Sequence, residues 1–365
     1  MQAIFWHLVC WMSGMILLRA EQFVVETGLP ILPNMPRIAE LPDSDAAWKN
    51  RSVADVVALW KDAVKSQRTA EAVMARNWLA INRGKDGDCY EAAVANARWG
   101  KQELALRFLL EVARREDFSV SDILSEEHFS SLLKHPRWSE VRKDLETCAT
   151  LWKESRYARA ILTLPKKHIK GSEIRIVVGL HGYGSLPEDF VGDDFQKICD
   201  EQQVAFLAVS GRGVMTRNSF EWTSDLNADV AHIFSQIEAV KDHAKEKSGQ
   251  TVIMGFSQGG QMALQLLAMH HERMRGIIAM SPGSRNPSQM RRAIPAASSE
   301  KLAGKTALIS WIHGEGKGMA NRCESDAAWL RSHGAKATIR EFPGEDHSWP
   351  DDYAGYFLSF LREIN

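Results

Sequence analysis

The sequence predicts an α/β domain, a mostly parallel sheet with helices on both faces, preceded by an all-α domain. Two observations carry this prediction. From residue 155 onward, short apolar runs of strand length alternate with helical stretches, whereas residues 45–154 repeat apolar side chains at helical spacing. The 365 residues also exceed what one ordinary core holds, so two domains are expected.

The composition is that of a globular protein, with 45% hydrophobic and 25% charged residues and a formal net charge of −1. No basic run or aromatic–basic stripe occurs, so we expect no nucleic-acid partner. No CxxC pair and no Cys/His cluster has zinc-ligand spacing, so we expect no metal site. The five cysteines are Cys10, Cys89, Cys148, Cys199 and Cys323.

Residues 1–20 form a hydrophobic N-terminal segment, with an apolar stretch over 3–18. This stretch has the length of a signal-peptide core and is short for a membrane span, so we expect export or a membrane tether. However, no Lys or Arg precedes this stretch. The alternative is that it is a loose hydrophobic arm or follows a misplaced start codon, and that the protein is cytoplasmic.

Residues 21–44 hold four prolines and no sustained period, so we predict a linker, followed by a helical domain over 45–154. One expected apolar helix face comprises Val53, Val56, Val57, Trp60 and Val64. Ala93, Ala97, Gly100 and Ala105 match the small-residue positions of a helix pair and resemble a tetratricopeptide-type repeat. Because only one unit matches well, we predict a degenerate repeat. It is either a docking surface for a protein partner or substrate, or a packing module for the second domain.

Residues 155–365 are predicted to form the α/β domain, with residues 158–165 and 172–180 as neighbouring strands. Further strands are expected over 204–211, 251–256, 276–281, 306–314 and 337–342, and helices around 187–201, 225–246, 258–272, 320–333 and 351–363. The polar stretch 283–304 is the sizeable loop between strands, which either caps a pocket or only connects.

A G-x-S-x-G pattern spans Gly255 to Gly259, directly after an apolar strand and before a helical run. A sharp strand-to-helix turn crowds the backbone around its serine, which is why the flanking residues are glycine. Ser257 is therefore the candidate nucleophile. A serine hydroxyl needs a base, and His347 follows the last predicted strand, where the chain order nucleophile then histidine is met.

The segment LHGYGS, residues 180–185, ends a predicted strand with two glycines that leave the backbone open to a substrate oxygen. An acyl-transfer intermediate carries a negative oxygen that needs preorganised N–H donors. The backbone N–H groups of Tyr183 and Gln258 are the candidates for this oxyanion hole. The alternative is that HGYG is only a tight turn.

Together, LHGYG, GFSQGG and GEDHSWP resemble the phospholipase/carboxylesterase family, which includes the acyl-protein thioesterases, over residues 157–365. The resemblance implies an α/β-hydrolase fold and hydrolysis of carboxylic esters or thioesters by a catalytic triad without a cofactor. It also implies that the region of Trp222 lines the acyl pocket, although an aromatic residue there could be simple core.

The triad acid departs from the family pattern, because Lys317 stands where the family has aspartate. A cation cannot stabilise the imidazolium that forms on His347. Glu315, two residues earlier on the same loop, is the favoured replacement. Four further carboxyl groups stay open as alternatives: Glu345 and Asp346 beside the histidine, and Glu324 and Asp326 on the following helix.

These residues predict a serine hydrolase that cleaves a small ester or thioester substrate through an acyl-enzyme. Two other functions are weighed against it. A serine peptidase would use the same residues on a different bond. A catalytically impaired hydrolase, marked by Lys317, would act as a binding protein through its helical domain.

Overall fold

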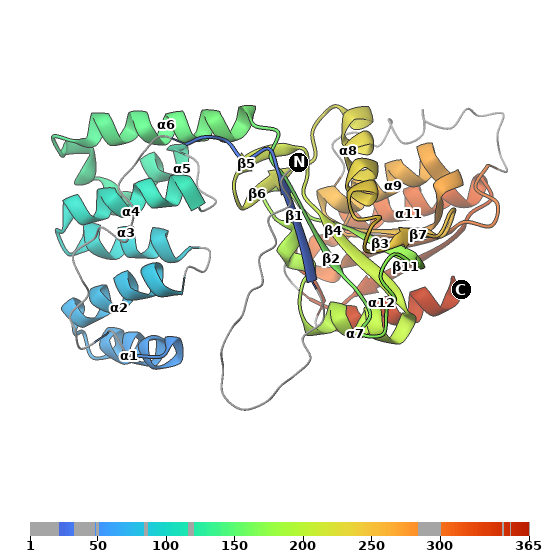
Figure 1. Ribbon diagram of the computed structural model, residues 1–365, viewed down its shortest axis with the longest axis horizontal. Coiled ribbons are helices and arrows are strands. Elements are labelled where there is room, and N and C mark those ends of the chain that lie inside the picture. Colours follow the sequence, from blue (N-terminus) through green and yellow to red (C-terminus); the bar gives the residue numbers. More distant parts are fainter. Residues whose placement is uncertain are drawn as a thin grey trace. The chain divides into compact units, whose positions relative to one another are not determined.

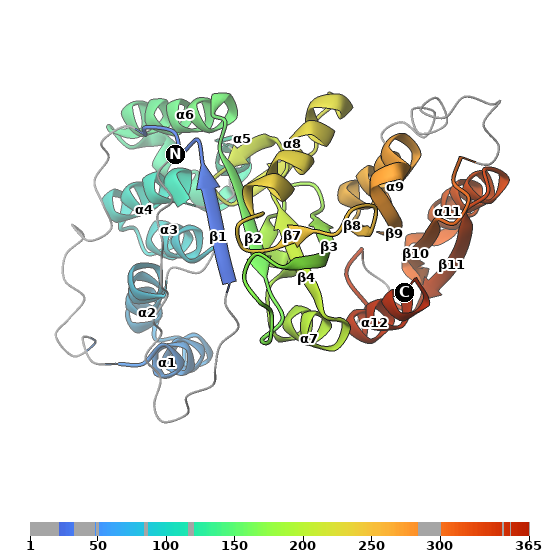
Figure 2. The ribbon, with the colours of Figure 1, turned by 45° about the vertical axis from the view of Figure 1, so that its right-hand side comes forward.

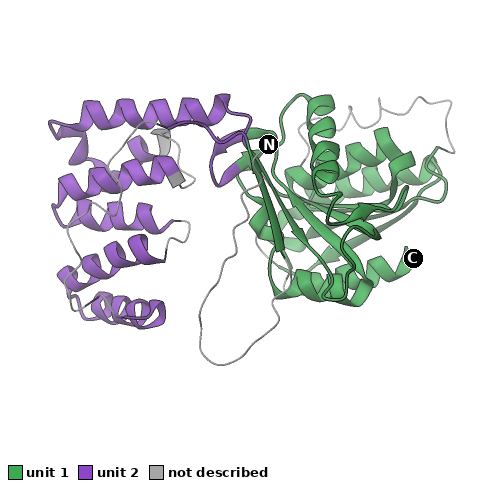
Figure 3. Cartoon of the chain, viewed as in Figure 1, with its two compact units in different colours: residues 1–27, 158–213, 220–365 green, residues 28–157, 214–219 purple. Residues whose placement is uncertain are grey.

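The computed structural model describes residues 22–32, 48, 51–83, 87–115, 120–283, 301–344, 347–350 and 352–364. The predicted hydrophobic segment 1–20, with its apolar stretch 3–18, lies outside these residues, as do most of the linker and residues 284–300 of the polar loop. The chain divides into two compact units, one with residues 1–27, 158–213 and 220–365 and one with residues 28–157 and 214–219 (Figure 3).

The helical unit is a succession of helices that pack against their neighbours along the chain, α1 on α2, α2 on α3 and α3 on α4, with α6 against α4 (Figure 1). Their bounds are α1 Val53–Lys65, α2 Thr69–Asn82, α3 Asp88–Arg98, α4 Gln102–Arg115, α5 Val120–Ser125 and α6 Trp138–Glu154. A capping box of Ser52 and Asp55 begins α1. The side chain of each residue accepts a hydrogen bond from the backbone N–H of the other.

Small residues lie where α3 meets α4. Ala93, Ala97 and Ala105 are buried, and Gly100 takes a φ of +75° in the turn between the two helices. The apolar face predicted for α1 is wrong in part, since Val53 and Val64 are 39% and 53% exposed. The buried face of α1 is narrower and centres on Val56 and Ala63, because α1 packs mainly against one neighbour, α2.

The other unit is built on a nine-stranded sheet in the order β1-β2-β4-β3-β8-β9-β10-β11, with β7 paired to β3. β1 and β4 both run antiparallel to β2, whereas all pairs from β4 to β11 are parallel. The strands are β1 Gln22–Thr27, β2 Ala158–Thr163, β3 Glu173–Leu180, β4 Val204–Val209, β7 Lys245–Glu246, β8 Thr251–Phe256, β9 Met274–Met280, β10 Thr306–Ile312 and β11 Lys336–Phe342. A separate pair consists of β5 Gly213–Thr216 and β6 Ser219–Glu221.

Two sequence-based predictions about this sheet are wrong. Residues 22–27, predicted as linker, form strand β1 and pair with β2 from Gln22 opposite Thr163 to Thr27 opposite Ala158. The partner lies far along the chain, so no local pattern indicates the pairing. Strands β2 and β3 are not neighbours, because β4 lies between them, with Leu207 opposite both Leu162 and Val178. The crossover from β3 through α7 returns β4 to the position beside β3.

Helices cover both faces of the sheet (Figure 2). Helices α8 Leu226–Ala239, α9 Gln258–His270 and α11 Gly316–Ser332 pack into one apolar cluster, and α7 Asp193–Gln202 and α12 Tyr353–Glu363 into another. The predicted fold class, a mostly parallel sheet with helices on both faces preceded by a helical domain, is confirmed. Within the part of the chain that the structure describes, no helix combines the length and the apolar character needed to cross a bilayer.

Candidate active site

Ser257 lies at the turn from β8 into α9, with φ 53° and ψ −116°. This left-handed conformation is strained for a residue with a side chain, and such strain persists only where the surroundings impose it. The surroundings here are two glycines. A Cβ on Gly255 would lie 2.1 Å from the carbonyl oxygen of Gly259, and a Cβ on Gly259 would lie 2.0 Å from that of Leu180. The turn therefore needs both glycines of the G-x-S-x-G pattern.

Glu315 lies after β10, and its side chain is only 8% exposed. Its Oε1 contacts Nδ1 of His347, and its Oε2 accepts hydrogen bonds from Ser281 Oγ at 2.7 Å and from the Ile312 N–H at 2.8 Å. Both carboxylate oxygens are thus held by donors. Because Nδ1 of His347 is occupied by Glu315, Nε2 is the nitrogen that remains to take a proton.

The other candidates for the acid stand differently. Lys317 is exposed at the start of α11, as is Glu324 further along that helix, and Asp326 is buried there. Glu345 and Asp346 lie outside the described residues. Glu315 is the carboxyl group that the structure, over its described residues, places in contact with His347.

His347 lies on the loop after β11, with its side chain 44% exposed. The ring of Phe256, the residue before Ser257, packs against the imidazole with 4.7 Å between ring centroids. Both Ser257 and His347 are described, and no hydrogen bond joins them. Catalytic hydrogen bonds of free enzymes are often long and form only with the reacting group in place.

The loop after β3 passes directly beside Ser257. A Cβ on Gly182 would lie 3.4 Å from the Cβ of Ser257, so glycine keeps this approach open, and Tyr183 follows with its side chain 55% exposed. On the other side of the serine, the N–H of Gln258 is at the first position of α9, where helical amides have no partner within the helix. The loop that carries Tyr183 thus approaches the serine turn at Gly182, and Gln258 directly follows the serine.

Trp222, which the family resemblance places at the acyl pocket, is a buried side chain in the structure. It is 2% exposed, and its indole N–H donates to the carbonyl oxygen of His181 at 2.9 Å. The ring also stacks on the imidazole of His181, with centroids 5.3 Å apart. A buried Trp needs an acceptor for its N–H, and this acceptor holds it in the core.

Sequence reasoning missed the structural role of His181. Its Nε2 accepts the Gly211 N–H at 2.8 Å, and its Nδ1 lies 2.6 Å from the carbonyl oxygen of Gly182, so both ring nitrogens are engaged. Burial lowers the pKa of His181 to about 4, which keeps the ring neutral. The histidine of the HGYG segment therefore holds the loop in place. In the sequence, its position beside two glycines of a turn was the signal that could have indicated this role.

The neutral state of His181 predicts a pH-dependent stability. In the unfolded chain its pKa is about 6.5, whereas burial holds the folded value at about 4, so the unfolded chain binds the proton first as the pH falls. The free energy of unfolding is expected to fall by about 3 kcal/mol between pH 6.5 and 4 through this one group. Urea unfolding at several pH values checks this. The His181→Gln variant, whose amide oxygen can still accept the Gly211 N–H, should show a flatter profile, and an unchanged slope would contradict the assignment.

In the part of the chain that is described, no group of three or more His, Cys, Asp or Glu side chains is placed to hold a metal ion.

The strained serine turn, the His347–Glu315 pair and the parallel sheet together define a protein of the α/β-hydrolase type. A family model described as the alpha/beta hydrolase family matches residues 177–362, just over half of the chain, and the chain belongs to this family.

No curated protein matches the chain significantly. Among solved structures, a carboxylesterase from Bacillus cereus is 18% identical over 56% of this chain and 94% of that chain, with a TM-score of 0.44. A ferulic acid esterase from Anaeromyces mucronatus is 17% identical over 58% and 86%, also at 0.44. An uncharacterized protein from Bacillus cereus is 13% identical over 86% and 99%, with the same score of 0.44.

Proposed function

We propose that the chain is a serine hydrolase that cleaves carboxylic esters or thioesters through an acyl-enzyme. The observation that carries the proposal is the contact between His347 Nδ1 and the buried carboxylate of Glu315. The imidazole of His347 also packs against Phe256, the residue before Ser257. A serine in a strained turn is by itself a backbone feature. A serine next to an imidazole that a carboxylate orients has the parts of a proton-transfer chain.

In the proposed mechanism, Ser257 Oγ attacks the acyl carbonyl while Nε2 of His347 takes the hydroxyl proton. The backbone N–H groups of Tyr183 and Gln258 receive the negative oxygen of the tetrahedral intermediate. His347 then donates its proton to the leaving alcohol or thiol. Water, deprotonated by the same nitrogen, releases the acid and restores the serine. Glu315 stabilises the imidazolium throughout, without taking the proton itself.

The contact with Glu315 also bears on the non-catalytic alternative, which rested on Lys317 standing at the expected acid position. Glu315 reaches the imidazole from two residues earlier, helped by a longer side chain than that of aspartate. The lysine is exposed at the start of α11 and takes no part in this contact. The substitution at position 317 therefore gives no reason to expect an inactive domain.

The proposal is tested with the purified protein, a fluorophosphonate probe and a panel of p-nitrophenyl esters and acyl thioesters of rising chain length. We expect labelling and turnover in the wild type and neither in the Ser257→Ala variant. A folded wild type that is neither labelled nor active would contradict the proposal and favour a binding protein. Labelling without turnover of any ester or thioester, together with cleavage of a peptide substrate, would favour the peptidase.

A further inference from the structure

Trp222 is hydrogen-bonded to both halves of the candidate oxyanion hole. Its backbone N–H donates to Oε1 of Gln258 at 3.0 Å, and its backbone carbonyl accepts from Nε2 of the same side chain at 2.7 Å. The side-chain amide of Gln258 thereby makes two hydrogen bonds with the backbone of one residue, Trp222. The indole N–H of Trp222 reaches the other half of the site, through the carbonyl oxygen of His181.

The loop that carries Tyr183 is held from the same side. His181 accepts the Gly211 N–H through its ring, and the Gly184 N–H donates to the carbonyl oxygen of Phe220 at 2.9 Å. Phe220 in turn donates its N–H to the carbonyl oxygen of Ser185 at 3.0 Å. Gly211, Phe220 and Trp222 all come from the excursion between β4 and α8, so one segment of chain touches the oxyanion loop at three points.

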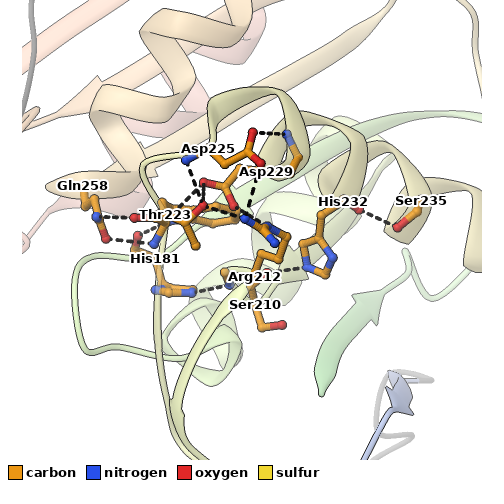
Figure 4. Close-up of polar contacts among 12 residues, drawn as sticks. His181, Ser210, Arg212, Thr223, Asp225, Asp229, His232, Ser235 and Gln258 are labelled. Carbon is orange, nitrogen blue, oxygen red and sulfur yellow. Dashed lines mark hydrogen bonds and ion pairs between the residues drawn. The ribbon is translucent and has the colours of Figure 1, made fainter. Parts of the chain in front are cut away.

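Trp222 is itself fixed in place. The N–H of Thr223, the next residue, donates to the buried Asp229 on α8 at 2.6 Å, and the Thr223 hydroxyl donates to the same oxygen at 3.1 Å (Figure 4). Nε of Arg212 lies 3.4 Å from the other oxygen of Asp229. Figure 4 also shows Gln258 and His181 converging on this region from separate elements. With its backbone tied to α8 and its ring buried, Trp222 has little freedom to move.

We propose that Trp222 is a positioning residue that sets the separation of the two oxyanion donors, the backbone N–H groups of Tyr183 and Gln258. The inference rests on the proposed function. An oxyanion hole accelerates a reaction only when its donors already point at the place where charge develops. These donors are 75 residues apart in the sequence, and Trp222 connects them through hydrogen bonds on both sides. Loss of the connection changes the affinity for the transition state and leaves that for the ground-state ester unchanged.

Two substitutions each cut one side of the connection. Trp222→Phe removes the indole N–H and keeps an aromatic ring against His181, and Gln258→Met removes the side-chain amide while keeping the backbone N–H. We expect each to lower kcat by roughly 10- to 100-fold, with KM within about twofold of wild type. Binding of a trifluoromethyl ketone, which forms a charged tetrahedral adduct with the serine, should weaken by the same factor as kcat/KM.

Trp329→Phe is the matched control, because Trp329 is another tryptophan packed on a histidine, His333, with ring centroids 4.3 Å apart, on α11. It should change neither kcat nor inhibitor binding. The double variant Trp222→Phe/Gln258→Met should lose about as much as the more affected single variant, since both cut one connection.

Circular dichroism and the thermal midpoint show whether Trp222→Phe is folded. If the folded variant has wild-type kcat and inhibitor affinity, the inference is overturned while the proposed function stands. Losses that multiply in the double variant would have the same consequence. An inactive, unlabelled wild type would overturn the proposed function and the inference with it.

Discussion

Replacing His347 with alanine is expected to reduce turnover of an activated ester by roughly 10⁶-fold, the size of effect that follows loss of the base in other serine hydrolases. Without Nε2 of His347, the Ser257 hydroxyl keeps its proton and remains a poor nucleophile. The measurement is kcat on a p-nitrophenyl ester, with circular dichroism to show that the fold is intact. The 44% exposure of the His347 side chain makes it tolerant of truncation.

The structure offers a matched control for this variant. His313 lies on the same loop as Glu315, is 76% exposed and also contacts a glutamate, Glu341, through Nδ1. His313→Ala therefore removes a similar surface pair without touching the serine turn, and it should keep wild-type turnover. If the two variants lost activity to the same extent, or if His347→Ala kept more than a hundredth of it, His347 would not be the base.

The second large effect is expected for Glu315→Gln, which should lower kcat by roughly 10⁴-fold while leaving the fold unchanged. Both the Ser281 hydroxyl and the Ile312 N–H donate to one carboxylate oxygen, so the amide oxygen of glutamine will take that position. The amide NH₂ then faces His347, where the carboxylate was. Because that group donates, Nδ1 of His347 must accept, and the ring proton moves to Nε2, the nitrogen that has to receive the serine proton.

Glu341→Gln is the corresponding control, since Glu341 makes the same kind of contact with the exposed His313. It should leave kcat within about twofold, as an exposed pair contributes little. Fluorophosphonate labelling of Glu315→Gln should be slowed in proportion to kcat. Wild-type turnover in Glu315→Gln would show that another carboxyl group serves His347, and the Asp346→Asn variant would then be the next to measure.

The α/β-hydrolase half was predictable because its signals are local. Strand-to-helix alternation, the glycines around Ser257 and the place of His347 after the last long strand are each contained in a few consecutive residues. The G-x-S-x-G pattern between a strand and a helix predicts a sharp turn with glycine at 255 and 259. The structure adds that the space at Gly259 is closed by the carbonyl oxygen of the distant Leu180. Local spacing likewise indicated the Ala and Gly positions between α3 and α4.

What the sequence left open depends on contacts between distant segments. Five carboxyl groups lay near His347 or its expected acid, and only the folded chain brings Glu315 to the imidazole across 32 positions. Strand β1 exists because β2 supplies hydrogen-bond partners from far along the chain. Trp222 had the aromatic character of a pocket residue, yet the folded chain buries it, with its indole N–H donating to the carbonyl oxygen of His181.

The sequence by itself determined the class of fold, the strained turn at Ser257 and the chain order of serine and histidine, since steric and periodic constraints act over short spans of chain. Only the tertiary structure decided which carboxylate orients His347, where β1 pairs and what Trp222 holds. Hydrogen bonds of this kind depend on distance in space, and the same local pattern is compatible with many partners until the sheet is assembled.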